Sequence, residues 1–274
     1  LSGCCGSEAR TAARIDTMHL NGLFVYPIKS CAGLAVDAWD LDERGLVGDR
    51  SYMVVDERGD FLTQREAPQL ATVCPELGER LRVTTPSGSA LADPGPVREV
   101  SVWQHTGPAL DCGDEVAEVL TSHLGRHCRL VALSPQHERP TSIGSGMVGF
   151  ADGYPLLVAT EASLSDLNAR MPSPLPMNRF RPNLVVTGSS AFDEDHWLSI
   201  EIGDVAMDLV KPCARCAITR VDQTTGVRGD GEPLRTLGTF RKAKGGVMFG
   251  WNVIHRSLGT LRVGDEVRVA ARRS

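Results

Sequence analysis

Two cysteines separated by two residues form the most specific chemical motif in the sequence. Cys213 and Cys216 stand in the segment Lys211-Pro212-Cys213-Ala214-Arg215-Cys216, and Arg220 follows shortly after. Cationic neighbours favour the thiolate form of a cysteine, which is both a nucleophile and a ligand for soft metals. The motif therefore predicts that at least one of the two sulfurs is ionised.

From the residues alone, four interpretations of this pair stay open. A structural zinc site needs four ligands, but there is no second Cys-x-x-Cys motif, and His123 and His127 stand far upstream. A thioredoxin-like dithiol should open a helix, whereas β-branched residues follow this pair. A single cysteine could hold a soft metal within a cofactor, which requires an anion-binding pocket elsewhere in the chain. The fourth interpretation is a β-turn with two buried cysteines.

Cationic and small polar residues at turns could supply such a pocket. They are Lys29 and Ser30 after Tyr26-Pro27-Ile28, Arg50 after Gly48-Asp49, Arg65 after Thr63-Gln64, and Arg179 and Arg181 on either side of Phe180. Each one alone is compatible with a solvated surface charge. Together they predict an oxyanion or phosphate pocket, because arginine forks and a lysine point charge are what a bound phosphate needs.

The elements that must position these residues are mostly short strands. Apolar alternation and turn residues predict strands at 20–26, 34–41, 51–56, 81–85, 100–103, 156–159, 184–187, 198–202, 205–210, 217–221, 247–254 and 261–269. Helices are expected at Asp114–Leu124, which has one apolar face, and after Thr160, which is a suitable N-cap. The strand spacing beyond Asn183 favours a closed or partly closed barrel.

The chain has 274 residues, which suits one large domain or two small ones. Residues 1–17 are small and polar and are expected to be a disordered N-terminal extension. A polar, proline-containing connection is predicted at residues 134–145. It divides an N-terminal module at 18–133 from a second domain at 146–272.

Composition excludes several classes of function. The net charge of −5 offers no general attraction to nucleic acid or anionic lipid. No apolar run is long enough for a membrane helix, and no secretory signal precedes the fold, so the cytoplasm is the expected location. The eight cysteines are expected to be reduced. Phosphate-binding glycine loops, the serine-hydrolase elbow and the zincin motif do not occur.

The sequence resembles the MOSC-domain molybdenum-cofactor proteins that carry an N-terminal MOSC β-barrel module. The resemblance covers about residues 19–270. Its carrying segments are Tyr26-Pro27-Ile28-Lys29-Ser30-Cys31, Gly48-Asp49-Arg50, Thr63-Gln64-Arg65-Glu66, Asn178-Arg179-Phe180-Arg181-Pro182-Asn183, Cys213-Ala214-Arg215-Cys216, Asp222–Gly226 and Phe249-Gly250-Trp251-Asn252. It implies an α+β fold that is predominantly β, with a β-barrel-like N-terminal module followed by a MOSC β-barrel domain.

Within this family the sequence is most similar to the mitochondrial amidoxime-reducing component and its bacterial relatives. This likeness implies a molybdenum–molybdopterin cofactor and an oxidoreductase that reduces N-hydroxylated compounds by two-electron removal of oxygen. Cys216 would be the metal ligand, and Cys213 a structural residue or a neighbour of the metal. The implied cofactor-binding residues are Lys29, Ser30, Arg50, Arg181, Asn183, Arg215 and Asn252.

Asp152, in Phe150-Ala151-Asp152-Gly153, resembles an acidic residue of the family near the cofactor. It is the expected proton carrier, with a pKa raised toward the working pH, and the alternative is a turn-capping role before Gly153. The chain ends at Ser274 without a ferredoxin domain, so electrons are expected from a separate donor protein. Two other functions stay open, namely a carrier of the cofactor or of sulfur without turnover, and a structural β-barrel protein without metal.

Overall fold

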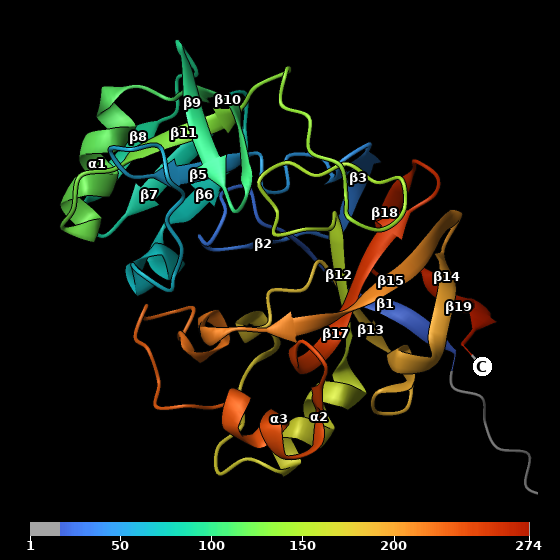
Figure 1. Ribbon diagram of the computed structural model, residues 1–274. Coiled ribbons are helices and arrows are strands. Elements are labelled where there is room, and N and C mark those ends of the chain that lie inside the picture. Colours follow the sequence, from blue (N-terminus) through green and yellow to red (C-terminus); the bar gives the residue numbers. More distant parts are fainter. Residues whose placement is uncertain (1–16, 274) are drawn as a thin grey trace, which may run out of the picture.

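The computed structural model describes residues 17–273, and strands dominate them (Figure 1). The expected disordered extension therefore lies, apart from Thr17, outside the described residues. No helix in the described part of the chain is long and apolar enough to cross a membrane. The six cysteines that are described, from Cys31 to Cys216, are free thiols, as the sequence predicts.

The larger sheet closes into a barrel. Its order is β12 (Leu156–Thr160), β13 (Leu184–Thr187), β1 (Met18–Val25), β19 (Glu266–Arg272), β14 (Trp197–Ile202), β15 (Val205–Arg215) and β17 (Gly246–His255), with β16 (Lys242–Ala243) beyond β17 and β2 (Leu34–Ala35) on β1. Pairing of β12 with β17 closes the ring. Gly250 permits this approach, because a Cβ there would lie 2.6 Å from the carbonyl oxygen of Val158.

The first strand of the chain belongs to this barrel. β1 pairs antiparallel with β13, with His19 opposite Thr187, and with β19, with Met18 opposite Val267. It is the blue strand among the barrel strands in Figure 1. Residues 18–25, which the sequence places in the N-terminal module at 18–133, thus pair with strands of the second segment, and the connection at 134–145 stays a prediction.

The barrel interior is filled by apolar side chains from every strand. Trp197, Leu20 and Ile200 are fully buried there. Each fully buried large aliphatic side chain contributes roughly 1.5–3 kcal/mol relative to an exposed one. Alternation in the first half of β15 produces this pattern, because every second residue there is buried, whereas β14 has an irregularity at Ser199 and Ile200.

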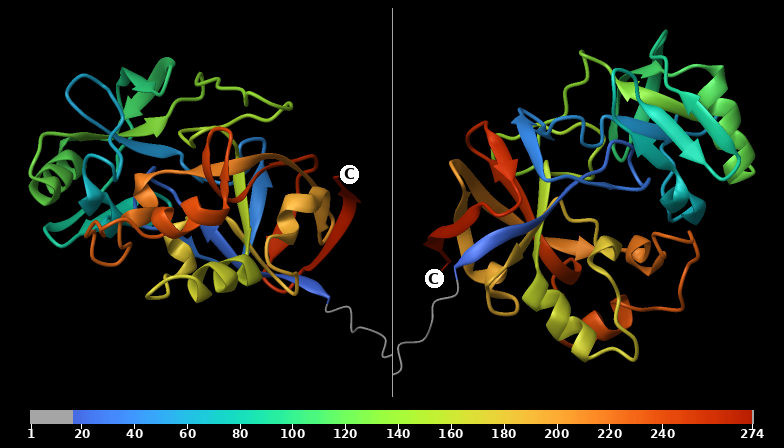
Figure 2. Two further views of the ribbon diagram at one scale, coloured as in Figure 1. Left: turned by 60° about the horizontal axis from the view of Figure 1, so that its bottom comes forward. Right: turned by 180° about the vertical axis from the view of Figure 1, so that it is seen from behind.

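Residues 52–133 form the neighbouring module, which lies beside the barrel in all three views (Figures 1 and 2). One sheet has the order β5 (Tyr52–Val55), β11 (Arg129–Leu133), β10 (His105–Asp111) and β9 (Val97–Val102), and a second has β6 (Cys74–Glu76), β7 (Arg82–Thr85) and β8 (Gly88–Leu91). A third small sheet, β18 (Thr260–Arg262), β3 (Ala38–Asp42) and β4 (Gly45–Leu46), joins residues from both ends of the chain.

The α-helices are few and short. α1 (Asp114–Leu124) has the predicted bounds and packs on β7 and β8. α2 (Glu161–Ala169) begins at Thr160, whose side chain accepts a hydrogen bond from the Ser163 N–H, as its role as N-cap predicts. The remaining helices are α3 (Leu234–Phe240) and the 3-10 turns η1 (Pro68–Thr72), η2 (Met177–Arg179), η3 (Asp193–His196) and η4 (Ala217–Arg220).

Three predicted strands differ from the structure. Residues 217–221, predicted as a strand from their β-branched side chains, form η4 instead. The Thr219 N–H and hydroxyl both donate to the Cys216 carbonyl, and these local bonds close a helical turn. The predicted strand 34–41 is divided into β2 and β3, and 261–269 into β18 and β19, with a turn at 263–265.

Candidate functional site

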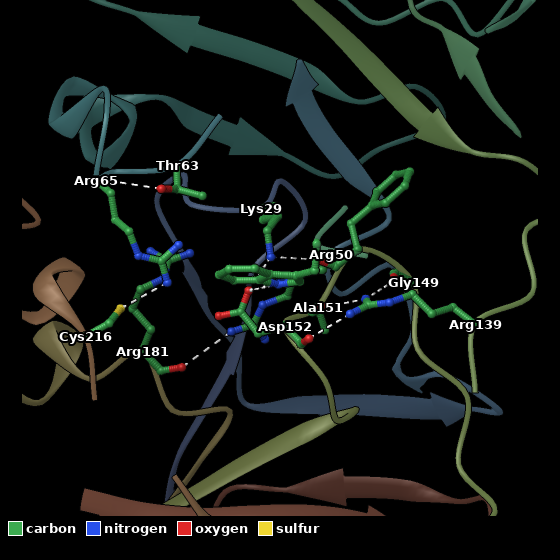
Figure 3. Close-up of polar contacts among 12 residues, drawn as sticks. Lys29, Arg50, Thr63, Arg65, Arg139, Gly149, Ala151, Asp152, Arg181 and Cys216 are labelled. Atoms are coloured by element: carbon green, nitrogen blue, oxygen red, sulfur yellow. Dashed lines mark hydrogen bonds and ion pairs between the residues drawn. The ribbon is translucent and has the colours of Figure 1, made fainter. Parts of the chain in front are cut away.

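All nine predicted site residues line one cleft. They come from loops after β1 and β4, from the connection before β12, from the segment around η2, from β15 and the residue after it, and from β17. These residues are Lys29, Ser30, Arg50, Asp152, Arg181, Asn183, Arg215, Cys216 and Asn252. Figure 3 shows five of them, Lys29, Arg50, Asp152, Arg181 and Cys216. Five of the seven sequence segments that carry the family resemblance therefore contribute residues to one cleft.

The cleft is lined by strained backbone. Five non-glycine residues in the described chain have a positive φ, and three of them, Ser30, Arg50 and Arg181, line the cleft. Each such residue costs on the order of 1–3 kcal/mol. Concentration of this strain at one place indicates that the backbone is held there to present particular side chains.

Lys29 and Asp152 form an ion pair at the cleft. Lys29 Nζ donates to Asp152 Oδ1 over 2.5 Å and to the Phe150 carbonyl over 2.9 Å. The lysine side chain is buried, whereas that of Asp152 is 64% exposed. Burial lowers the pKa of Lys29, and the carboxylate opposes that shift. Lys29 is thus held in place with its charge already partly compensated.

The pKa of Asp152 shifts opposite to the expectation for a proton carrier. Removal from water by the surrounding protein would raise the pKa of Asp152. The charge and the hydrogen bond of Lys29, together with the Arg65 guanidinium, outweigh this effect and hold the pKa well below its usual range. Its side chain bonds to Lys29 and Trp103, so it does not cap a turn before Gly153 either. Asp152 is thus favoured as a carboxylate at neutral pH, and it accepts hydrogen bonds from Lys29 and Trp103.

A buried network holds Arg50. Its Nη1 donates to Asp49 Oδ2 over 2.5 Å and to Asn183 Oδ1 over 3.1 Å. The Asn183 amide in turn donates to Asp49 Oδ1 and to the Phe24 carbonyl. Asn183 lines the cleft, but its hydrogen-bonding groups are used inside the protein. It therefore positions Arg50 and Asp49.

Arg181 carries an unmatched buried charge. Its Nη1 donates to Gln223, its guanidinium stacks on Tyr26 at 4.3 Å, and its buried Nη2 has no partner in the described chain. Burial lowers the pKa of Arg181 to about 10, so the residue is still cationic at neutral pH. A buried charged donor without an acceptor is costly, which indicates that the site is built to receive an anion.

Arg139 fixes the loop that carries Asp152. Its guanidinium donates to the carbonyl oxygens of Gly149, Ala151 and Asp152 (Figure 3). Gly149 lets this loop lie against the chain after β4, because a Cβ there would be 2.9 Å from the Arg50 carbonyl oxygen. The loop that presents the carboxylate is therefore rigidly placed, although no sequence pattern indicated a role for Arg139.

The two thiols lie at the end of β15 and are half-buried. Arg215 Nη1 is 2.8 Å from Cys213 Sγ, and Arg65 Nη2 is 3.3 Å from Cys216 Sγ. Of the three sequence neighbours expected to affect these thiols, only Arg215 contacts one. The described residues contain no group of three or more His, Cys, Asp or Glu side chains suited to a metal ion, so they form no zinc site with four protein ligands.

Two residues that contact the site are not among the nine predicted ones. Arg65 is one of the predicted pocket cations, but its contact with Cys216 spans 151 positions in the chain and does not follow from the sequence. Trp103 donates from Nε1 to Asp152 Oδ1 over 3.2 Å. The signal for Arg65 is its place in the segment Thr63-Gln64-Arg65-Glu66, whereas nothing in the sequence around Trp103 indicates a role for it.

The balance of charge in the cleft favours an anion. Four cationic side chains and one carboxylate line it, and one of these cations, Arg181, is buried without a carboxylate partner in the described chain. Cys216 adds a soft sulfur donor to the same surface. This combination of donors can hold a negatively charged group that also carries a thiophilic metal.

Comparison with known proteins identifies both parts of the chain. The family profile of the MOSC N-terminal beta barrel domain matches residues 17–127, and that of the MOSC domain matches residues 145–268. Mitochondrial amidoxime reducing component 2 of Bos taurus is 35% identical, covering 89% of this chain and 81% of that protein. Mitochondrial amidoxime-reducing component 1 of Homo sapiens is 32% identical over the same shares.

A third relative is longer. Molybdenum cofactor sulfurase of Oryza sativa subsp. japonica is 32% identical, covering 86% of this chain but only 32% of that protein. These matches and the predominantly β fold agree with the resemblance found in the sequence. The chain belongs to the MOSC-domain proteins that have an N-terminal MOSC β-barrel domain.

Proposed function

We propose that the cleft binds a molybdenum–molybdopterin cofactor. The observation that carries this proposal is that Cys216 and the unmatched guanidinium of Arg181 line the same cleft. A cofactor that combines a phosphate with a soft metal needs a thiolate ligand and buried cationic donors. The relatives named as amidoxime-reducing components and as a molybdenum cofactor sulfurase support the same assignment.

The residues divide between the two parts of such a cofactor. Cys216 would ligate the metal, with Arg65 donating toward its sulfur. Lys29, Ser30, Arg50 and Arg181 would hold the phosphate and the pterin. Asn183 keeps Arg50 in position. Arg215 and Asn252, which line the same cleft, complete the set.

The activity that fits best is the reduction of N-hydroxylated compounds such as amidoximes or hydroxylamines. The bound cofactor would pass on two electrons from the donor protein, and with two protons from solvent these convert N–OH to N–H and release water. The protein contributes placement and charge. Asp152 would accept a hydrogen bond from the substrate, because its pKa is too low for it to store a proton at neutral pH.

Electrons would come from a separate donor protein in the cytoplasm. The donor protein and the cytoplasmic location are both predictions from the sequence. The amidoxime-reducing relatives are named as mitochondrial. The half-buried Cys216 leaves the thiol side of the cleft open for substrate.

Turnover tests this function. The full chain, produced in a host that makes the cofactor, is supplied with an excess of a chemically reduced viologen and benzamidoxime, and benzamidine formation is measured. We expect repeated turnover by the parent and by Cys213→Ala, and none by Cys216→Ala. Activity that survives in Cys216→Ala would rule out this sulfur as the essential ligand.

A second function is favoured by the similarity to molybdenum cofactor sulfurase. In that case the chain would carry the cofactor, or a sulfur atom on Cys216, without turning over a substrate. The same assay separates the two functions, because a carrier forms no more benzamidine than the reducing equivalents it brought into the assay.

A further inference from the structure

Trp103 has a backbone conformation that costs free energy. It is the first of two residues that connect β9 to β10, where Val102 pairs with His105. Its φ of 56° lies in the left-handed region, a clear outlier for a bulky side chain. Burial does not compensate for this cost, because 46% of the residue stays exposed. An outlier of this kind points to a functional role.

Four contacts hold the indole at the rim of the cleft. Nε1 donates to Asp152 Oδ1 over 3.2 Å, and the ring centroid lies 5.0 Å from that of Phe61. The Arg65 guanidinium lies 4.9 Å and Lys29 Nζ 5.9 Å from the ring. Since Arg65 also contacts Cys216, a single side chain links the indole to the proposed metal ligand. The ring is thus fixed although it is exposed.

Asp152 places a polar group beside this ring. Lys29 and Trp103 both donate to Oδ1, and no donor in the described chain reaches Oδ2. An ionised carboxylate oxygen only accepts hydrogen bonds. A partly exposed aromatic ring next to a free acceptor suits a ligand that is flat and has an N–H group.

We propose that Trp103 is a specificity-determining residue that packs against the aromatic ring of an N-hydroxylated substrate, while Asp152 Oδ2 accepts a hydrogen bond from the substrate amino group. The inference rests on the proposed function for its substrate class, but it concerns binding at the rim rather than reduction. Benzamidoxime has both features. Acetamidoxime keeps the amino group and lacks the ring. The change in preference between the two compounds, from the parent to a Trp103 variant, therefore isolates the contribution of Trp103.

The test compares kcat/KM for benzamidoxime and acetamidoxime in the loaded full-length protein. Trp103→Ala should lower the ratio of the two values about three- to tenfold, mainly through the KM of benzamidoxime, as expected for loss of one aromatic contact. Trp103→Phe, which keeps a ring, should stay within about twofold of the parent. Trp39→Phe is the control, because the Trp39 indole donates to the Val47 carbonyl, whereas the Trp103 indole donates to Asp152, which lines the cleft.

A binding measurement separates this proposal from the proposed function. Calorimetric titration of the same proteins with both amidoximes gives their affinities without turnover. If the parent reduces neither compound but prefers benzamidoxime in a way that Trp103→Ala abolishes, the role of Trp103 stands and the reductase function fails. If Trp103→Ala prefers benzamidoxime over acetamidoxime as strongly as the parent does, the proposal is overturned. This holds even if Trp103→Ala is less stable, because Trp103 would then have only a structural role.

Discussion

Two groups of side chains line the same cleft and differ in how they are held. Lys29, Arg50 and Arg181, the cation group, are mostly buried, and protein partners hold each of them: Asp152 for Lys29, Asp49 and Asn183 for Arg50, and Gln223 for Arg181. Cys213, Arg215 and Cys216, the thiol group, are half-buried at the end of one strand. The cation group is organised before any ligand arrives, whereas the thiol group stays open, and this division suits a site that grips an anion and leaves a reactive centre accessible.

The largest effect is expected where the cation group is anchored. Asp49→Ala should lower the free energy of unfolding by about 3–5 kcal/mol, because it leaves Arg50 as an uncompensated charge and removes acceptors from the Tyr26 N–H and from Asn183. Chemical denaturation measures the loss. The matched control is Asp166→Ala, which breaks the exposed pair with Arg170 and should cost about 0.5 kcal/mol or less. Equal losses in both variants would refute a preorganised cation group.

Acid should destabilise the protein through His137, a buried histidine next to the segment that binds Lys29. His137 is buried, and its ring packs against Phe150, whose carbonyl binds Lys29. Burial, followed by the neighbouring charge of His105, lowers the pKa of His137 to about 4. The unfolded chain binds this proton more readily, so the contribution to stability is complete above pH 6.5 and falls toward pH 4, by about 3 kcal/mol.

Unfolding of the parent and of His137→Phe at pH 7 and pH 4.5 measures this contribution. The variant cannot titrate at this position, so it should lose less stability than the parent between the two pH values. An identical loss in both proteins would show that His137 is not the source of the acid sensitivity.

Arg181 tests whether the cation group holds an anion. Arg181→Met should reduce retention of the phosphate-bearing pterin about tenfold or more, because one charge-assisted donor is lost from a buried site. Pterin fluorescence after gel filtration measures retention. Arg268→Met, which removes an exposed arginine paired with Glu201, should leave it unchanged. Retention by Arg181→Met that matches this control would contradict the assignment.

The smallest effect is expected at Cys213. Its thiol contacts Arg215 and is not the proposed ligand, so Cys213→Ala should change molybdenum retention by about threefold or less. Metal analysis of the purified variant checks this value. A complete loss of metal would show that both cysteines are needed to hold it and would contradict the separate roles of Cys213 and Cys216.

Local patterns predicted local structure well. The helix at Asp114–Leu124 and the strand at Leu184–Thr187 have the bounds that apolar spacing gives. The error at residues 217–221 arose because β-branched residues favour strands, whereas the hydrogen bonds of Thr219 to the Cys216 carbonyl decide the outcome. The place of β1 in the barrel depends on pairing with strands far along the chain, which periodicity does not report.

The candidate site was predictable where a motif carried it and not where tertiary contacts create it. The nine residues named from the sequence gather in one cleft because they lie in segments that resemble the family. The direction of the Asp152 pKa shift depends on Lys29, 123 positions away, and the link between Trp103 and Cys216 depends on Arg65. Neither follows from composition or spacing.

The molybdenum and pterin contents of the purified protein test the central claim most directly. The parent chain, Cys216→Ala and Cys213→Ala are produced in a host that makes the cofactor, and both contents are measured per chain. We predict about one molybdenum and one pterin in the parent, similar values in Cys213→Ala, and loss of molybdenum in Cys216→Ala. A parent that carries neither, or a Cys216→Ala variant that keeps its molybdenum, would contradict the account.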